Sequence, residues 1–202
     1  VRGLSESVEA GFSGIVGGQP VNSYIISRLV TNLNDIFAAA NVAVNVSTNV
    51  GQFQGQDFST VFVSRTAEPT AFAFNNFFGQ SERVDAFNLD KNDQAGVFAP
   101  SLQVLGFGPS QAGVDAFIQS LTASVARRIG ELVGLRPIAN AGASNVVPVM
   151  SANSPTIIAP AYRFNSGAAR LSNSWDALFN ANYYLGQQND VALLDRILAD
   201  RF

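Results

Sequence analysis

The sequence predicts an α+β domain in which two long helices pack on one mixed sheet and a small, loop-rich lobe follows. Two stretches, 21–41 and 111–135, repeat apolar residues every three or four positions, as amphipathic helices do. Four shorter stretches between them are rich in β-branched residues or alternate apolar and polar residues, as strands do. Hydrophobic residues make up 47% of the 202 residues, so the chain can fill a substantial core.

The N-terminal part is predicted to contain a lead-in and the first long helix. Residues 1–19 are rich in glycine and should form an irregular lead-in with one short strand. The helix follows at 21–41. Asn22 or Ser23 is its expected N-cap, because these residue types accept hydrogen bonds from the first turn. The apolar stripe of this helix consists of Ile25, Ile26, Leu29, Val30, Leu33, Ile36 and Phe37.

Strands are predicted between the two long helices. They are placed at 42–48, 58–64, 83–89 and 95–102. Turn-forming residues separate them at 51–56 and in the sequence DKND at 90–93. A phenylalanine-rich loop is expected at 69–81, before the third strand.

The second long helix is predicted at 111–135, with Ser110 as its N-cap and Gly134 as the C′ residue. Its apolar stripe consists of Val114, Phe117, Ile118, Leu121, Val125, Ile129 and Leu132. Pro, Gly, Asn and Ser then recur as far as residue 174, so this part should be mostly loop. Two short helices are predicted at 175–186 and 189–202.

These elements divide the chain into a lead-in, one main domain and a terminal helix. The main domain is placed at 20–186. Its sheet and long helices occupy a lobe at 20–135, and the smaller C-terminal lobe occupies 136–186. The last helix is assigned to 187–202.

Charge and composition argue against several kinds of partner. The net charge is −3 and only 13% of residues are charged, so no basic surface is expected to bind nucleic acid. No apolar run approaches the roughly 20 residues that a membrane-spanning helix needs. The chain begins with Val, so we expect that a leader was removed or that this is a piece of a longer chain. Abundant Asn, Gln, Ser and Thr favour a secreted or surface protein of a bacterium.

Histidine and cysteine are both absent from the chain. Their absence excludes Ser-His-Asp and Cys-His hydrolysis, disulfide bonds and thiolate chemistry. It also removes the commonest ligands of zinc. We therefore expect no zinc and no catalytic residue of these kinds.

One segment, VARRIGELVGLRP at 125–137, has the spacing of a zinc-peptidase helix without its ligands. Such a helix carries His, Glu and His at i, i+1 and i+4, then a turning Gly and a third His. The corresponding positions here are Arg127, Arg128, Glu131, Gly134 and Pro137, of which Gly134 alone is retained. The residues between these positions are also similar to those that separate the ligands in such zinc-peptidase helices: Ile129, Gly130, Leu132, Val133, Leu135 and Arg136.

Two further stretches match in the right order. VVPVMSANSP, which holds the only methionine, Met150, is similar to the Met-turn that lies beneath the site in this family. Upstream, the order of helix, strands and helix is reproduced. The chain thus resembles the metzincins, most closely bacterial matrixin-type domains, over roughly residues 20–185. The alternative is an ordinary helix that ends in a common pattern, GELVGL.

This resemblance implies a zincin fold with a degenerate HExxHxxGxxH motif, and therefore a pseudopeptidase. The three ligands and the general base are missing, and the cations Arg127 and Arg128 would repel Zn²⁺. Glu131 lies four residues after Arg127 and three after Arg128, so ion pairs are expected on the helix surface. Arg136 is a candidate to join them. The alternative is a solvated patch of charges.

An acidic turn and an aromatic cluster are further candidate sites. Oxygen ligands in one turn suit Ca²⁺, and they come from Asp85, Asn88, Asp90, Asn92 and Asp93. Turn formation alone also explains such residues. Four phenylalanines, Phe72, Phe74, Phe77 and Phe78, are expected either to fill the core or to contact another subunit. The apolar face of the last helix, Val191, Leu193, Leu194, Ile197 and Leu198, has the same two interpretations.

The sequence therefore favours a secreted, catalytically inactive metzincin-like domain that self-associates or binds other surface proteins as a structural or interaction module. A second hypothesis is a module that holds a peptide or glycan without cutting it. A third is a hydrolase with an unconventional carboxylate site, which would depend on Glu131.

Overall fold

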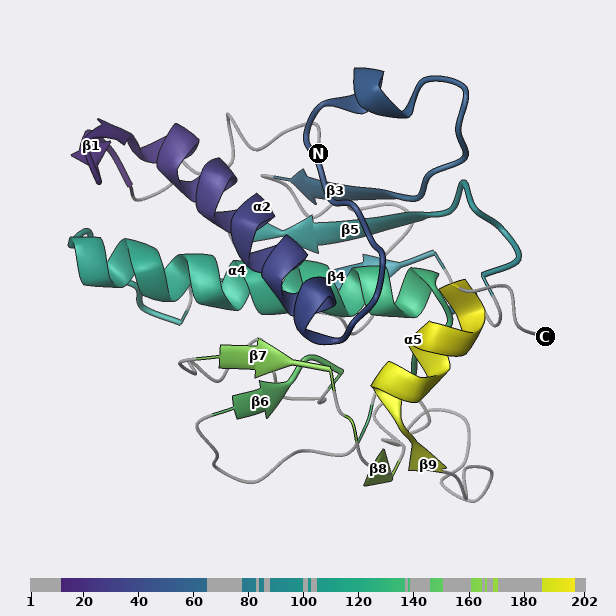
Figure 1. The fold of residues 1–202 in the computed structure, drawn as a ribbon. Coiled ribbons are helices and arrows are strands. Elements are labelled where there is room, and N and C mark those ends of the chain that lie inside the picture. Colours follow the sequence, from purple (N-terminus) through teal and green to yellow (C-terminus); the bar gives the residue numbers. More distant parts are fainter. Residues whose placement is uncertain are drawn as a thin grey trace.

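Figure 1 shows the chain as a computed structural model. It describes residues 12–64, 78–82, 84, 85, 88–99, 102, 105–136, 138, 146–150, 161–164, 166, 169, 170 and 187–198. Within these ranges the elements form an α+β arrangement with a mixed sheet and two long helices, as the sequence predicts.

The main sheet has three strands in the order β3 (Thr60–Ser64), β5 (Gln94–Phe98) and β4 (Gly79–Ser81). β3 runs parallel to β5, with Thr60 opposite Gln94, whereas β4 runs antiparallel to it. The predicted strands at 58–64 and 95–102 are thus confirmed, as shorter strands at 60–64 and 94–98. The predicted loop at 69–81 is wrong at its end, because its last residues form β4; residues 69–77 lie outside the described part.

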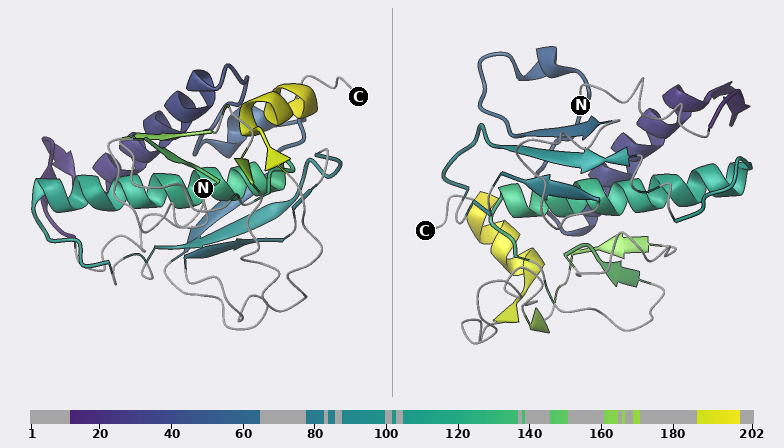
Figure 2. Two further views of the ribbon diagram at one scale, coloured as in Figure 1. Left: turned by 90° about the horizontal axis from the view of Figure 1, so that it is seen from below. Right: turned by 180° about the vertical axis from the view of Figure 1, so that it is seen from behind.

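The two long helices form successive layers on one face of this sheet. α4 (Gln111–Leu132) lies across one face of the sheet and contacts all three strands, and α2 (Val21–Ala39) packs on α4 (Figures 1 and 2). Both match their predicted positions. The core-facing residues of α2 are fully or nearly buried: Val21, Ile25, Leu29, Leu33, Ile36 and Phe37. α4 is covered on most sides, so that every residue from Ser120 to Arg128 is buried.

The start of α2 differs from its prediction. Pro20 is the N-cap and makes no side-chain capping hydrogen bond, so the assignment to Asn22 or Ser23 is wrong. A hairpin of β1 (Ile15–Val16) and β2 (Gln19–Pro20) leads directly into the helix. The carbonyl of Gly14, just before this hairpin, accepts from the Val21 N–H at 3.0 Å, so the main chain satisfies one of the free N–H groups of the first turn.

The two ends of α4 have the predicted caps. The Ser110 hydroxyl accepts a hydrogen bond from the Gly113 N–H at 3.2 Å. Gly134 adopts φ +97°, which favours glycine, and its N–H donates to the Glu131 carbonyl. The N–H of Leu135 donates to the carbonyl of Gly130 at 2.8 Å, so the helix ends in a Schellman motif.

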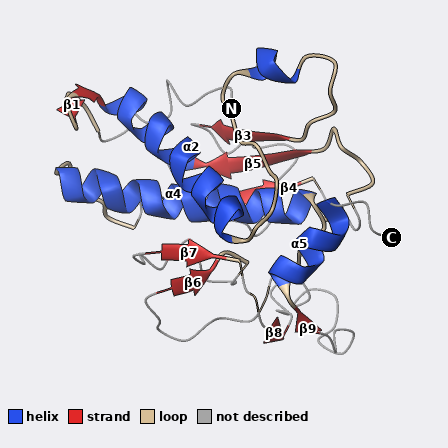
Figure 3. Cartoon of the chain, in the orientation of Figure 1, coloured by secondary structure: helices blue, strands red, loops and turns tan. Residues whose placement is uncertain are grey.

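The predicted strand at 42–48 is wrong. This segment follows α2 as loop (Figure 3), although the burial of its side chains alternates over 42–46. The side chain of Asn34 forms hydrogen bonds with both main-chain polar groups of Val46. Its amide nitrogen donates to the carbonyl at 3.1 Å, and its oxygen accepts from the N–H at 3.0 Å. A short 3-10 helix, η1 (Val50–Phe53), then occupies the predicted turn.

The predicted strand at 83–89 is also wrong over the residues that are described, which are 84, 85, 88 and 89. The Asn88 N–H donates to the carbonyl of Asp85, and the Asp90 N–H donates to the carboxylate of Asp85 at 2.7 Å. Asn88 has φ +50°. These side-chain and turn bonds compete with strand pairing, as is typical of Asp and Asn.

The C-terminal lobe contains short strands where mostly loop is predicted. β6 (Val146–Pro148) runs parallel to β7 (Ala161–Arg163), and β8 (Ala169–Arg170) runs antiparallel to β9 (Gln187–Gln188). α5 (Asp190–Leu198) confirms the last predicted helix over these residues, whereas the helix predicted at 175–186 lies outside the described residues. No helix in the described ranges combines the length and the apolar character needed to cross a membrane.

Candidate functional site

The charged residues of the motif positions lie on the last turns of α4 and are buried. Arg127, Arg128 and Glu131 are 5%, 3% and 0% exposed. The prediction of ion pairs is confirmed, but the prediction that they lie on the helix surface is wrong. The alternative of a solvated patch is wrong for the same reason.

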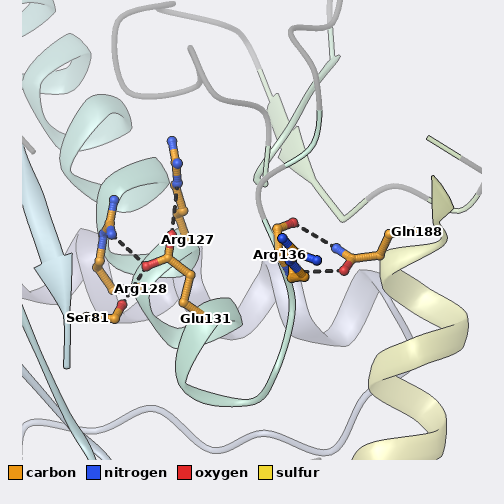
Figure 4. Close-up of polar contacts among 6 residues, drawn as sticks. All are labelled: Ser81, Arg127, Arg128, Glu131, Arg136 and Gln188. Carbon is orange, nitrogen blue, oxygen red and sulfur yellow. Dashed lines mark hydrogen bonds and ion pairs between the residues drawn. The ribbon is translucent and has the colours of Figure 1, made fainter. Parts of the chain in front are cut away.

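Glu131 is the centre of this cluster (Figure 4). Its Oε1 lies 3.3 Å from Arg127 Nε, and its Oε2 lies 2.6 Å from Arg128 Nη1. The hydroxyl of Ser81 donates a third hydrogen bond to Oε2 at 2.5 Å. Both carboxylate oxygens are therefore engaged. We call Ser81, Arg127, Arg128 and Glu131 the Glu131 cluster.

The cluster joins the helix to the sheet. Helical spacing brings the two arginines to Glu131, whereas Ser81 comes from β4, which runs beside α4. The N–H of Asp85 adds a bond to the Glu131 carbonyl at 3.1 Å. No local sequence signal marks Ser81, so its part in the cluster was not predictable from the pattern of α4.

Burial is the main influence on the charge of Arg128. It lowers the pKa of the guanidinium to about 10, and Glu131 opposes this shift, whereas the nearby Arg127 adds to it. Arg128 therefore remains protonated at neutral pH. Its Nε is buried without a hydrogen-bond partner in the described part of the chain. The cluster keeps charge in a buried position, which is costly unless the opposite charge stays in place.

Other motif positions fall around the end of the helix. Gly134 makes the predicted turn. Pro137 lies outside the described residues. Met150 is fully buried beside Gly130, close enough that a Cβ at Gly130 would lie 2.6 Å from its Sδ. The carbonyl of Met150 accepts from the Ile138 N–H at 2.9 Å, so the methionine turn is tied to the chain that leaves α4.

The expected role of Arg136 is wrong. Arg136 lies apart from Glu131 (Figure 4), and its main chain is bound by a different side chain. Gln188 accepts from the Arg136 N–H at 2.9 Å and donates to the Arg136 carbonyl at 2.9 Å. The same amide donates to Asp190 at 2.8 Å. Gln188 thus fastens the start of α5 to the chain beyond α4.

Replacing Gln188 by Ala is expected to lower the free energy of unfolding by about 1–3 kcal/mol, because it removes the partner of two main-chain groups and of Asp190. Urea unfolding followed by circular dichroism measures the change. The exposed Gln54→Ala is the control and should stay within about 0.5 kcal/mol of the parent. Equal values for the two variants would contradict the proposed fastening.

The residues of the candidate calcium turn serve mainly as hydrogen-bond partners of the turn. Asp85 and Asp93 are buried, and the Asp85 carboxylate accepts from the Asp90 N–H. Asp90 accepts from the Asn92 N–H at 3.0 Å, and the Asn92 amide faces Asp57 at 3.4 Å. In the residues that the structure describes, no three His, Cys, Asp or Glu side chains gather as a metal site. Calcium binding stays a prediction.

Of the four phenylalanines of the predicted aromatic cluster, the structure describes Phe78. Phe78 is half-buried, packs against the core and accepts a hydrogen bond from the Phe98 N–H through its carbonyl. Phe72, Phe74 and Phe77 lie outside the described residues. In α5, Leu194 and Ile197 are buried, so part of this apolar face is used inside the domain.

Comparison of the chain with protein-family models, with curated proteins and with solved structures gave no match.

Proposed function

We propose that the chain is a catalytically inactive metzincin-like domain that acts as a structural or interaction module of an extracellular or cell-surface assembly. The observation that carries this proposal is the Glu131 cluster. At the positions where the resemblance expects two zinc ligands and a general base, the side chains bind one another inside the protein.

The chemistry of these groups opposes a metal-dependent reaction. Guanidinium groups only donate hydrogen bonds, so neither Arg127 nor Arg128 can accept the proton of an attacking water or hold a cation. Both oxygens of Glu131 already accept hydrogen bonds from Arg127, Arg128 and Ser81, so a metal would have to compete with these partners. The chain also has no His or Cys that could act in its place. A hydrolase that relied on Glu131 would have to break this cluster first.

Three features of the surroundings support the metzincin-like frame. Gly134 turns the chain directly after α4, and the turn of Met150 packs against the same end of the helix. A mixed sheet lies against one side of α4, and α2 packs on α4. In this proposal the buried ion pairs take over the task of a metal, because they join elements that are distant in sequence.

A role in an assembly is favoured by the low charge of the chain. Only 13% of its residues are charged and the net charge is −3, so repulsion between copies is weak. The many Asn, Gln, Ser and Thr residues of the chain support a secreted or surface location in this proposal.

The test combines light scattering after size exclusion with elemental analysis and a peptidase assay. We expect oligomers whose mass grows with protein concentration, no zinc in stoichiometric amount, and no cleavage of a fluorogenic casein with or without added Zn²⁺. A monomer at all concentrations would contradict the assembly role. Stoichiometric zinc or turnover would contradict the inactive site.

A further inference from the structure

A polar groove lies between α2, α4 and β7, on the N-terminal half of α4. It has a volume of about 370 Å³, which is at the small end of the range for ligand pockets. None of the residues of the Glu131 cluster lines it. The groove is therefore a feature separate from the degenerate motif.

Among the described residues that line this groove, positive and negative side chains are equal in number. Arg28 and Arg163 carry positive charge, and Asp35 and Asp115 carry negative charge. None of the four forms an ion pair with another described residue. A ligand with a net charge of either sign would therefore meet repulsion as well as attraction, so the lining favours a ligand with no net charge.

Side chains that both donate and accept hydrogen bonds lie between these charges. Asn32 and Thr122 face one another across the two helices, with the amide nitrogen 3.4 Å from the hydroxyl. Gln119 is a half-buried residue of α4 that also lines the groove. Its side-chain amide makes no hydrogen bond to any described residue. The hydroxyl and amides together can pair with neighbouring groups that donate and accept in turn, as sugar hydroxyls do.

The Asp115 side of the groove is held in place by its own contacts. Its carboxylate accepts from the hydroxyl of Tyr24 at 2.8 Å and from the amide of Gln111 at 3.0 Å. The bond to Asp115 raises the pKa of Tyr24, so the tyrosine remains a neutral donor at physiological pH. These contacts orient the Asp115 carboxylate without a ligand, which reduces the entropy lost on binding.

The apolar part of the lining is small. Ile36, Ile118 and Tyr162 are buried and supply carbon surface among the polar groups. Such a surface suits the C–H face of a sugar ring, whereas a lipid or other apolar ligand would leave the amides and charges without partners.

We propose that this groove binds a neutral, polyhydroxylated ligand, about one or two sugar units of a glycan. The proposal goes beyond the structural role above and does not depend on it, because binding in the groove requires neither assembly nor an inactive motif.

The test uses the whole chain, labelled with ¹⁵N, and follows its amide signals during titration. Maltose, cellobiose and N,N′-diacetylchitobiose are the neutral probes, and glycylglycine and galacturonate are the zwitterionic and acidic controls. At millimolar concentrations we expect at least one neutral sugar to shift the side-chain amide signals of Asn32 and Gln119. The shift should persist from about 0.01 M to about 1 M salt, because a neutral ligand is not screened.

Gln119→Ala provides the matched variant. Alanine is a strong helix former and the glutamine amide holds no described partner, so the fold should be retained. Affinity for the sugar should fall about three- to tenfold through the loss of one hydrogen bond. Gln52→Ala, on the exposed η1 and away from the groove, should bind as the parent does.

Three results would overturn the proposal. The first is that no neutral sugar shifts any signal of the groove. The second is that glycylglycine or galacturonate binds more tightly than every sugar and loses affinity in salt, which would assign the groove to a charged ligand. The third is that sugar affinity is unchanged by Gln119→Ala, which would place binding elsewhere.

Discussion

Glu131→Gln is expected to lower the free energy of unfolding by about 3–5 kcal/mol, because it leaves buried positive charge without its counterion. The substitution keeps the shape of the side chain and removes its charge. Its new amide group also donates hydrogen bonds, and it would face Arg127, Arg128 and Ser81, which are themselves donors here. Equilibrium unfolding in urea measures the change.

Glu82→Gln is the matched control, because Glu82 is exposed and lies next to Ser81 in the chain. Its effect should stay below about 1 kcal/mol, as for other surface charges. Arg128→Met and the double variant Arg128→Met/Glu131→Gln complete a cycle. The loss of unfolding free energy in the double variant should be smaller than the sum of the losses in the two single variants by about 0.5–3 kcal/mol. Equal effects of Glu131→Gln and Glu82→Gln would show that water reaches the cluster.

The long helices were predictable because their information is local. Periodic apolar residues specify α2 and α4, and Ser110 and Gly134 specify where α4 begins and ends. The N-cap of α2 was not predictable in the same way. It depends on the Gly14 carbonyl, which only the β1–β2 hairpin brings to the helix.

The predicted strands failed where side chains take the place of a neighbouring strand. Residues 42–46 keep the alternating burial of a strand, but the Asn34 amide binds both main-chain polar groups of Val46. A residue twelve positions away thus completes hydrogen bonds that a sheet would otherwise make. The side-chain amide of Gln188 likewise binds the N–H and the carbonyl of Arg136, which lies 52 positions earlier in a segment predicted as loop. Such amide pairing suits a chain with few charges and many amides.

The ion pairs were predictable and their burial was not. Helical spacing alone brings Arg127 and Arg128 to Glu131. Whether water reaches them depends on β4 and on the rest of the fold that surrounds α4, which the pattern of one helix does not contain. Burial changes the expected contribution of Glu131 from a few tenths of a kcal/mol to several.

Restoring the missing ligands is expected to create a zinc site if the chain has the metzincin-like frame. The variant combines Arg127→His, Arg128→Glu, Glu131→His and Pro137→His, which places three imidazoles and a general base at the family spacing. It should bind one Zn²⁺ per chain. Zinc at about 1,000 times its dissociation constant should then stabilise the variant by about 4 kcal/mol, because the metal binds the folded state only.

Omitting one substitution separates a built site from accidental binding. With Pro137 kept, two imidazoles remain and zinc should be held much more weakly, since three protein ligands define such a site. The combined variant has also lost the Glu131 cluster, so it should be less stable than the parent without metal and should recover stability when zinc is added. A variant that folds but binds zinc no better than the one with Pro137 would argue against the metzincin-like frame. Tight binding that needs all three imidazoles would mean that α4 and the turn after Gly134 keep the geometry of a metal site, which the Glu131 cluster now replaces with ion pairs.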